Sequence, residues 1–112
     1  MQNNTAIPDY SHHSKFELLE LVVNSRTCER EATADLVLAL REFDRRKLYL
    51  DEGYTSLYAF CQEKLKLSEG ASMRRINAAR VLEHHPEVYQ KLRDGSLSLC
   101  AVAEIYKVLR KE

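Results

Sequence analysis

Side chains that can read DNA bases fall on one face of a helix expected between residues 69 and 84. Arg74 and Asn77 are three positions apart, and Met73 precedes Arg74. An arginine can bind guanine through two hydrogen bonds, and an asparagine can bind adenine in the same way. The first turns of a recognition helix are the part that meets base edges. We therefore expect Met73, Arg74 and Asn77 to be base-reading positions on double-stranded DNA.

Basic side chains gather around the start of the same helix. Between residues 64 and 80 there are five lysines and arginines, and Glu69 is the only acidic residue. A local basic patch can neutralise phosphates and release their counterions, and free amides at a helix start can bind an anion. The predicted phosphate contacts are Lys64, Lys66, Ser68, Arg75 and Arg80. The alternative is a solvated helix face that carries basic charge without binding DNA.

The charge of the whole chain gives no sign of a nucleic-acid partner, because its formal net charge is zero. Its distribution is uneven. Residues 1–40 hold six acidic and three basic residues, whereas residues 41–112 hold eleven acidic and fourteen basic residues. Any phosphate-binding surface is therefore expected in the second part of the chain.

Histidines and cysteines are not spaced for metal binding. The histidines form two adjacent pairs, and neighbouring side chains on a helix point about 100° apart, so a pair cannot share one metal in the usual way. The three widely spaced cysteines are expected to be small core residues of a reduced, cytoplasmic protein. No hydrolase, nucleotide-binding or metalloprotease motif is present. We expect no cofactor, no metal and no catalytic residue in this chain.

The elements that must position these residues are all helical. Three glycines and two prolines leave few breaks, and no segment alternates as a strand does. We predict an all-α fold of five to six helices with a central helix-turn-helix and a long N-terminal helical hairpin. The expected flexible tail spans 1–13, and the helical domain spans 14–112. The expected helices are 14–25, 28–49, 56–65, 69–84, 86–93 and one that begins after Ser98.

The turn of the predicted helix-turn-helix lies between Leu65 and Ser68. Ser72, Ile76 and Ala79 are spaced to face the partner helix, and small residues permit the close crossing that this motif needs. Residue 66 is a lysine at a position where such turns usually have glycine. We therefore expect Lys66 to adopt a positive φ, which non-glycine residues tolerate poorly.

The first predicted helix suggests an alternative function. Ser14 and Glu17 have the spacing of a capping box, and the residues that follow are apolar on much of the helix circumference. Such a helix is expected to pack on more than one side or against another chain. The alternative is a protein-interaction or dimerisation domain that uses the helices of residues 14–49, as a homodimer.

Ordered motifs along the chain resemble a known family. The segments are 45–50, 53–61, 65–80 and 85–99, which contain the strings GYTSLYAF, LSEGASMRRINAAR and HPEVYQKLRDGSLSL. Together they resemble the helical N-terminal region of bacterial HNH-endonuclease-type proteins and, more distantly, ParB-like DNA-binding proteins. The resemblance implies a cytoplasmic, nucleoid-associated DNA-binding module with residues 68–80 facing DNA and residues 86–99 as support. In that family the helical region is often followed by an HNH nuclease, whose paired His and Asn this chain lacks.

Overall fold

The computed structural model describes residues 6–111, and its regular structure is entirely helical over that range. The helices follow one another as α1 (Lys15–Arg45), α2 (Leu48–Asp51), α3 (Leu57–Glu63), α4 (Glu69–His84), α5 (Val88–Asp94) and α6 (Leu99–Leu109). The predicted all-α class is confirmed. Residues 6–13 of the predicted tail contain no helix, and residues 1–5 of that tail lie outside the described range.

The predicted N-terminal hairpin is wrong, because α1 is one continuous helix of 31 residues. The capping box begins it: Ser14 Oγ accepts the amide hydrogen of Glu17 at 3.1 Å, and Glu17 Oε1 accepts that of Ser14 at 2.7 Å. No glycine or proline follows until well beyond Arg45. Only such residues strongly oppose a helix interior, so the change from apolar to polar residues near Arg26 does not end the helix.

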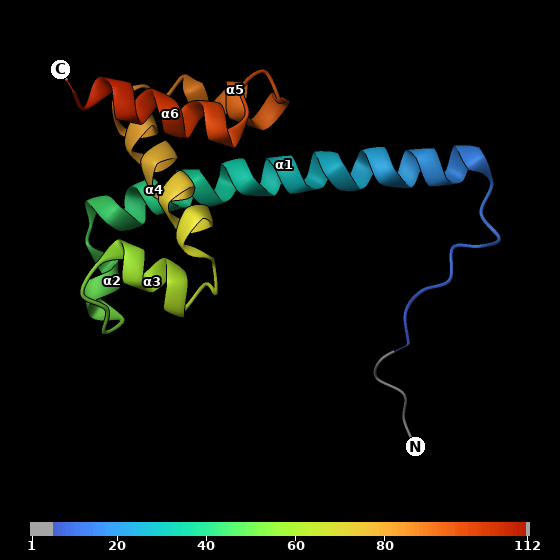
Figure 1. Ribbon diagram of the computed structural model, residues 1–112, viewed down its shortest axis with the longest axis horizontal. Coiled ribbons are helices and arrows are strands. Elements are labelled where there is room, and N and C mark those ends of the chain that lie inside the picture. Colours follow the sequence, from blue (N-terminus) through green and yellow to red (C-terminus); the bar gives the residue numbers. More distant parts are fainter. Residues whose placement is uncertain (1–5, 112) are drawn as a thin grey trace.

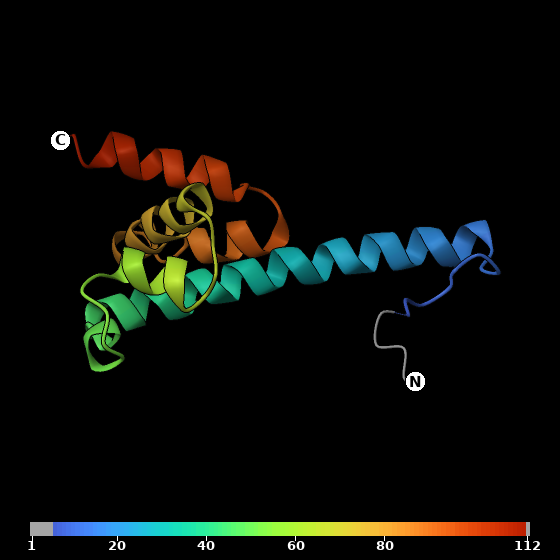
Figure 2. The ribbon, with the colours of Figure 1, turned by 60° about the horizontal axis from the view of Figure 1, so that its bottom comes forward.

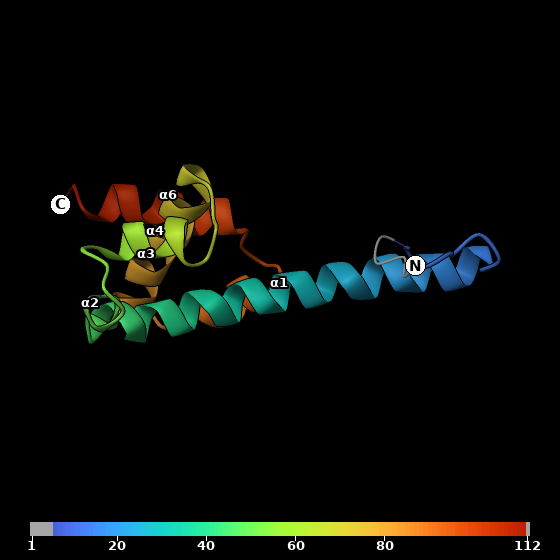
Figure 3. The same ribbon diagram turned by 90° about the horizontal axis from the view of Figure 1, so that it is seen from below.

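The second half of α1 supports the rest of the chain, and its first half extends beyond it. Figure 1 shows α4 crossing α1, with α5 and α6 above α1 and α2 and α3 below it. Figures 2 and 3 show the N-terminal half of α1 projecting away from all other helices. The radius of gyration is 17.5 Å, against about 13 Å for a compact domain of this length. The projection of α1 accounts for this extended shape.

The core lies around α4, the helix that packs against α1, α3 and α6. Apolar residues that recur every three or four positions form its buried sides, as expected for a helix contacted from several directions. The core also contains three aromatic rings in contact. The ring centroids of Phe60 and Phe43 are 4.6 Å apart, and Tyr54 meets Phe60 edge-on with centroids 5.4 Å apart. The fully buried larger side chains include Val37, Cys61, Ile76, Val81, Leu82 and Val102.

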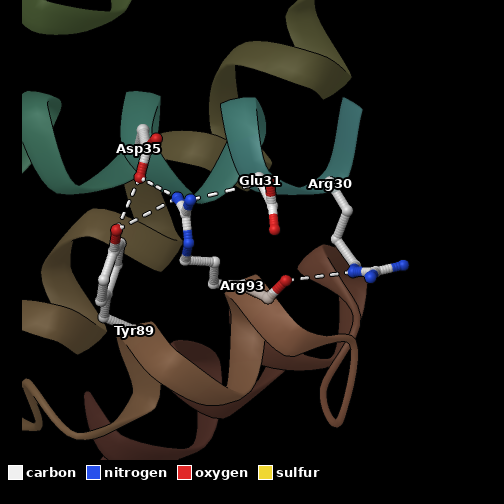
Figure 4. Close-up of polar contacts among 5 residues, drawn as sticks. All are labelled: Arg30, Glu31, Asp35, Tyr89 and Arg93. Carbon is white, nitrogen blue, oxygen red and sulfur yellow. Dashed lines mark hydrogen bonds and ion pairs between the residues drawn. The ribbon is translucent and has the colours of Figure 1, made fainter. Parts of the chain in front are cut away.

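Polar contacts hold α5 against α1, as Figure 4 shows. Tyr89 donates its hydroxyl hydrogen to Asp35 Oδ1 at 2.6 Å, and Arg93 Nη1 donates to the same oxygen at 2.8 Å. Arg93 also lies 3.6 Å from Glu31, while Arg30 Nε donates to the Arg93 carbonyl at 3.1 Å. The Tyr89 hydroxyl, followed by Arg93, lowers the pKa of the Asp35 carboxyl. These contacts fix α5, and therefore the start of α6, on the middle of α1.

Candidate nucleic-acid interface

Helices α3 and α4 and the turn between them occupy the segment of the predicted helix-turn-helix. Ser56 Oγ accepts the Ala59 amide hydrogen at 3.0 Å, and Ser68 Oγ accepts the Ala71 amide hydrogen at 3.1 Å, so both helices begin at a serine cap. The predicted positive φ of Lys66 is confirmed, at 61°. This left-handed residue allows the chain to turn back, and the Leu67 amide then donates to the Cys61 carbonyl at 3.1 Å.

The inward face of α4 is also as predicted. Ser72, Ile76 and Ala79 are all buried. Leu65 and Leu67, on either side of Lys66, pack against the core from the turn. The arrangement leaves the turn and the first residues of α4 at the surface, whereas residues 76–79, 81 and 82 further along α4 are buried.

Three of the five predicted phosphate contacts lie together at this exposed end. Lys64, Lys66 and Ser68 are all exposed, and within residues 6–111 neither lysine forms an ion pair. The first amides of a helix lack intrahelical acceptors. Ser68 binds that of Ala71, which leaves the amides of residues 69 and 70 at the surface. Two exposed lysines and two amides without an intrahelical acceptor thus fall within residues 64–70.

Arg75 and Arg80 do not join that group. Arg75 donates to the Ala71 carbonyl of its own helix at 3.0 Å and lines a cavity beside α1. Burial, followed by the nearby charge of Arg74, lowers the pKa of Arg75. Arg80 Nε lies 3.6 Å from Asp44 Oδ2, so its charge is already paired with α1. The three arginines of α4 therefore have different surroundings: Arg74 is exposed, Arg75 bonds to its own helix and Arg80 pairs with α1.

The predicted base-reading face is partly covered. Met73 is 41% exposed and Arg74 is exposed, but Asn77 is only 6% exposed. The prediction that Asn77 reads a base is wrong, because α6 packs against α4 at this level and Asn77 and Ala103 line the same narrow cavity. A buried amide cannot reach a base edge. Asn77 therefore does not contribute adenine recognition to the candidate interface.

Arg74 lies over the exposed start of α4. A Cβ atom placed on Gly70 would be 3.1 Å from Arg74 Nη1, so the guanidinium occupies the space that the missing side chain leaves. The arginine charge thus sits one helical turn from Ser68 and its neighbouring amides. Sequence reasoning placed Arg74 among base readers and did not anticipate this position.

Sequence reasoning also missed Lys107. This residue on α6 lines the cavity that contains Met73 and Arg74, and its Nζ lies 3.0 Å from Glu104 Oε2. The pair is recognisable from its three-residue spacing, but its place beside α4 is not.

Metal binding has no candidate site among the described residues, where no three His, Cys, Asp or Glu side chains are grouped. Nor does any helix of residues 6–111 combine the length and the apolar character needed to cross a bilayer. No family model, curated protein or solved structure matches this chain.

Proposed function

We propose that this chain is a DNA-binding helical module that contacts duplex phosphates through the exposed end of its helix-turn-helix. The observation that carries the proposal is that Arg74 lies over Gly70 at the start of α4, while Lys64 and Lys66 are exposed in the turn that leads into it. Three cationic groups and a helix start are the elements that bind a phosphate backbone. We name this surface the basic end.

The basic end supports backbone binding more than sequence reading. With Asn77 buried, the side chains left for base contacts are Arg74, which suits guanine, and Met73, which suits the thymine methyl group. Glu69 is exposed beside Ser68, and its carboxylate opposes a nearby phosphate. We therefore expect weak sequence preference and an affinity dominated by salt-sensitive contacts.

The resemblance to the helical region of HNH-endonuclease-type proteins supports the same proposal, since that region is associated with DNA. On this proposal the chain positions DNA in the bacterial cytoplasm, at the nucleoid, and catalysis belongs to a separate nuclease domain.

Titration of a fluorescent 20-base-pair duplex, followed by anisotropy at several salt concentrations, tests the proposal. Three phosphate contacts give a slope of about −2.7 in log affinity against log salt, a loss of roughly fortyfold between 50 and 200 mM. Lys64→Ala with Lys66→Ala reduces the slope by about 1.8. Lys91→Ala, which removes an exposed charge on α5, is the matched control and leaves the slope unchanged. Absence of binding at micromolar protein in low salt refutes the proposal.

A second candidate function is self-association, which the exposed apolar side chains on the first half of α1 favour. Phe16, Leu19, Val22 and Val23 are between 52% and 78% exposed. A row of such residues on one projecting helix is unusual for a monomer. Because α1 is continuous, the candidate is restricted to its N-terminal half rather than to a hairpin. Sedimentation equilibrium tests it, and a concentration-independent monomer excludes it.

A further inference from the structure

The exposed apolar residues of α1 form a row that leads toward the bundle. Phe16, Leu19 and Val23 have the spacing i, i+3, i+7, and Val22 lies beside them, so all four share one side of the helix. We call these four residues the N-terminal stripe; they are 78%, 56%, 52% and 64% exposed in that order. Tyr10 of the tail lies at one edge of the stripe, where it lines a cavity with Leu18, Leu21 and Val22. Phe16, Leu19 and Val23 do not line that cavity.

A cavity with a volume of about 620 Å³ lies where α1 enters the bundle. Three arginines on its wall come from two helices, Arg26 and Arg30 from α1 and Arg75 from α4. Its apolar wall includes Leu92, Leu97 and Leu99. We call this space the arginine cavity. Its leucines can contact an apolar side chain, and its arginines can pair with acidic residues next to that side chain.

We propose that two copies of the chain pair antiparallel through the first halves of α1, and that Phe16 of each copy enters the arginine cavity of the other. This inference rests on the self-association candidate above and gives it a partner and a geometry. The pairing is isologous, with the same patch used by both copies, as a two-fold axis requires.

The spacing along α1 supports this register. With the two-fold axis beside Val23, residue 16 of one copy lies opposite residue 30 of the other, and residue 20 lies opposite residue 26. Arg26 and Arg30 both line the arginine cavity, so one axis position places Phe16 at the cavity. A parallel pairing places Phe16 against Phe16 and leaves both cavities unfilled.

Charge is complementary in the antiparallel arrangement. Residues 9–20 contain three acidic residues and one basic residue, whereas the arginine cavity has three arginines and one glutamate, Glu29. The register brings Glu20 opposite Arg26 of the other copy, twice per dimer. Opposite charges at such positions favour one orientation over the other. In a parallel pairing, Glu17 of one copy instead lies beside Glu17 of the other, and Glu20 beside Glu20, so that like charges meet.

The area that a stable dimer needs also points to insertion of Phe16. Stable interfaces bury about 800 Å² per partner, more than four partly exposed side chains of one helix supply. An aromatic side chain buries about 150–250 Å² and is a frequent interface anchor. Seating Phe16 in the cavity adds the surface of Leu97 and Leu99 and extends contact to the helix ends. The bundles of the two copies then lie at opposite ends of the paired helices.

Sedimentation equilibrium of the full chain, of 13.0 kDa, measures the first part of the proposal. We expect a dimer, and Phe16→Ala weakens it roughly a thousandfold, because each copy loses an anchor that contributes about thirtyfold. The side chain of Phe16 is mostly exposed in the single chain, so its loss leaves the circular dichroism spectrum unchanged. Leu50→Ala, which shortens an exposed apolar side chain on α2, is the matched control and leaves the dimer intact.

Disulfide formation tests the orientation, in a background where Cys28 and Cys100 are replaced by serine. Val23→Cys lies at the axis and forms a covalent dimer on oxidation. Leu19→Cys does not, because eight residues of offset separate the two thiols by about 12 Å along the axis, far beyond disulfide reach. A monomer at all concentrations overturns self-association and this geometry together. A dimer that crosslinks through Leu19→Cys, or that survives Phe16→Ala unweakened, overturns only the geometry.

Discussion

Replacing Lys66 by glycine should stabilise the protein while weakening its binding to DNA. Lys66 has a φ of 61°, and a left-handed conformation costs a non-glycine residue about 1–2 kcal/mol. Glycine adopts it without strain but loses about 0.5–1 kcal/mol more in conformational entropy on folding. The net gain in the free energy of unfolding is therefore about 0–1.5 kcal/mol, with a central value of about 0.75 kcal/mol. With a urea m value of about 2 kcal/mol/M, the central value raises the unfolding midpoint by about 0.4 M.

Lys64→Gly provides the matched control, because the two lysines are two positions apart in the same turn. Lys64 has ordinary helical dihedrals, φ −85° and ψ −46°, so glycine there lowers stability by about 0.5–1 kcal/mol. Each variant removes one charge from the basic end, and each should reduce the salt slope of DNA binding by about 0.9. Urea denaturation followed by circular dichroism measures the stabilities. Midpoints that shift in the same direction would refute the assignment of strain to Lys66.

Three further predictions concern the core and the contact between α1 and α5. Ser72 Oγ is buried and makes no hydrogen bond within residues 6–111, so Ser72→Ala should raise stability by about 1 kcal/mol in urea denaturation; a lower midpoint would contradict this. The pKa of Asp35 is lowered in the folded state, so its contribution is present above the unfolded pKa and is lost as the pH falls through the folded one. In thermal melts, Asp35→Asn should therefore be less stable than the wild type at neutral pH, and the difference in stability should shrink at acid pH. A difference that does not change with pH would count against the linkage. Cys61 is fully buried and burial raises the pKa of its thiol, whereas Cys28 and Cys100 are exposed and not core residues as expected. A thiol reagent should therefore modify only Cys28 and Cys100 before unfolding; rapid reaction of all three would contradict the packing of α3.

Features that depend on neighbouring residues were predictable from the sequence. The serine caps of α1, α4 and α6 and the inward face of α4 follow from spacing within a few positions, because caps and helix faces are set by local geometry. The positive φ of Lys66 was predictable because residue 66 stands where such turns usually have glycine. The end of α1 was not predictable in this way. Lys47 also has a positive φ, of 51°, although its neighbours favour helix. Packing of Tyr49 and Tyr54 against the core accompanies this turn.

Side chains on α4 that look equivalent in the sequence differ because of helices distant in the chain. Asn77 is buried because α6, more than twenty residues later, lies across it, and Arg80 is paired because Asp44 on α1 reaches it. Local spacing specifies which residues share a helix face, but not which face another helix will cover. The sequence by itself therefore determined an all-helical chain with a helix-turn-helix at residues 57–84. Only the tertiary structure decided that the exposed basic end is limited to the turn and the first residues of α4.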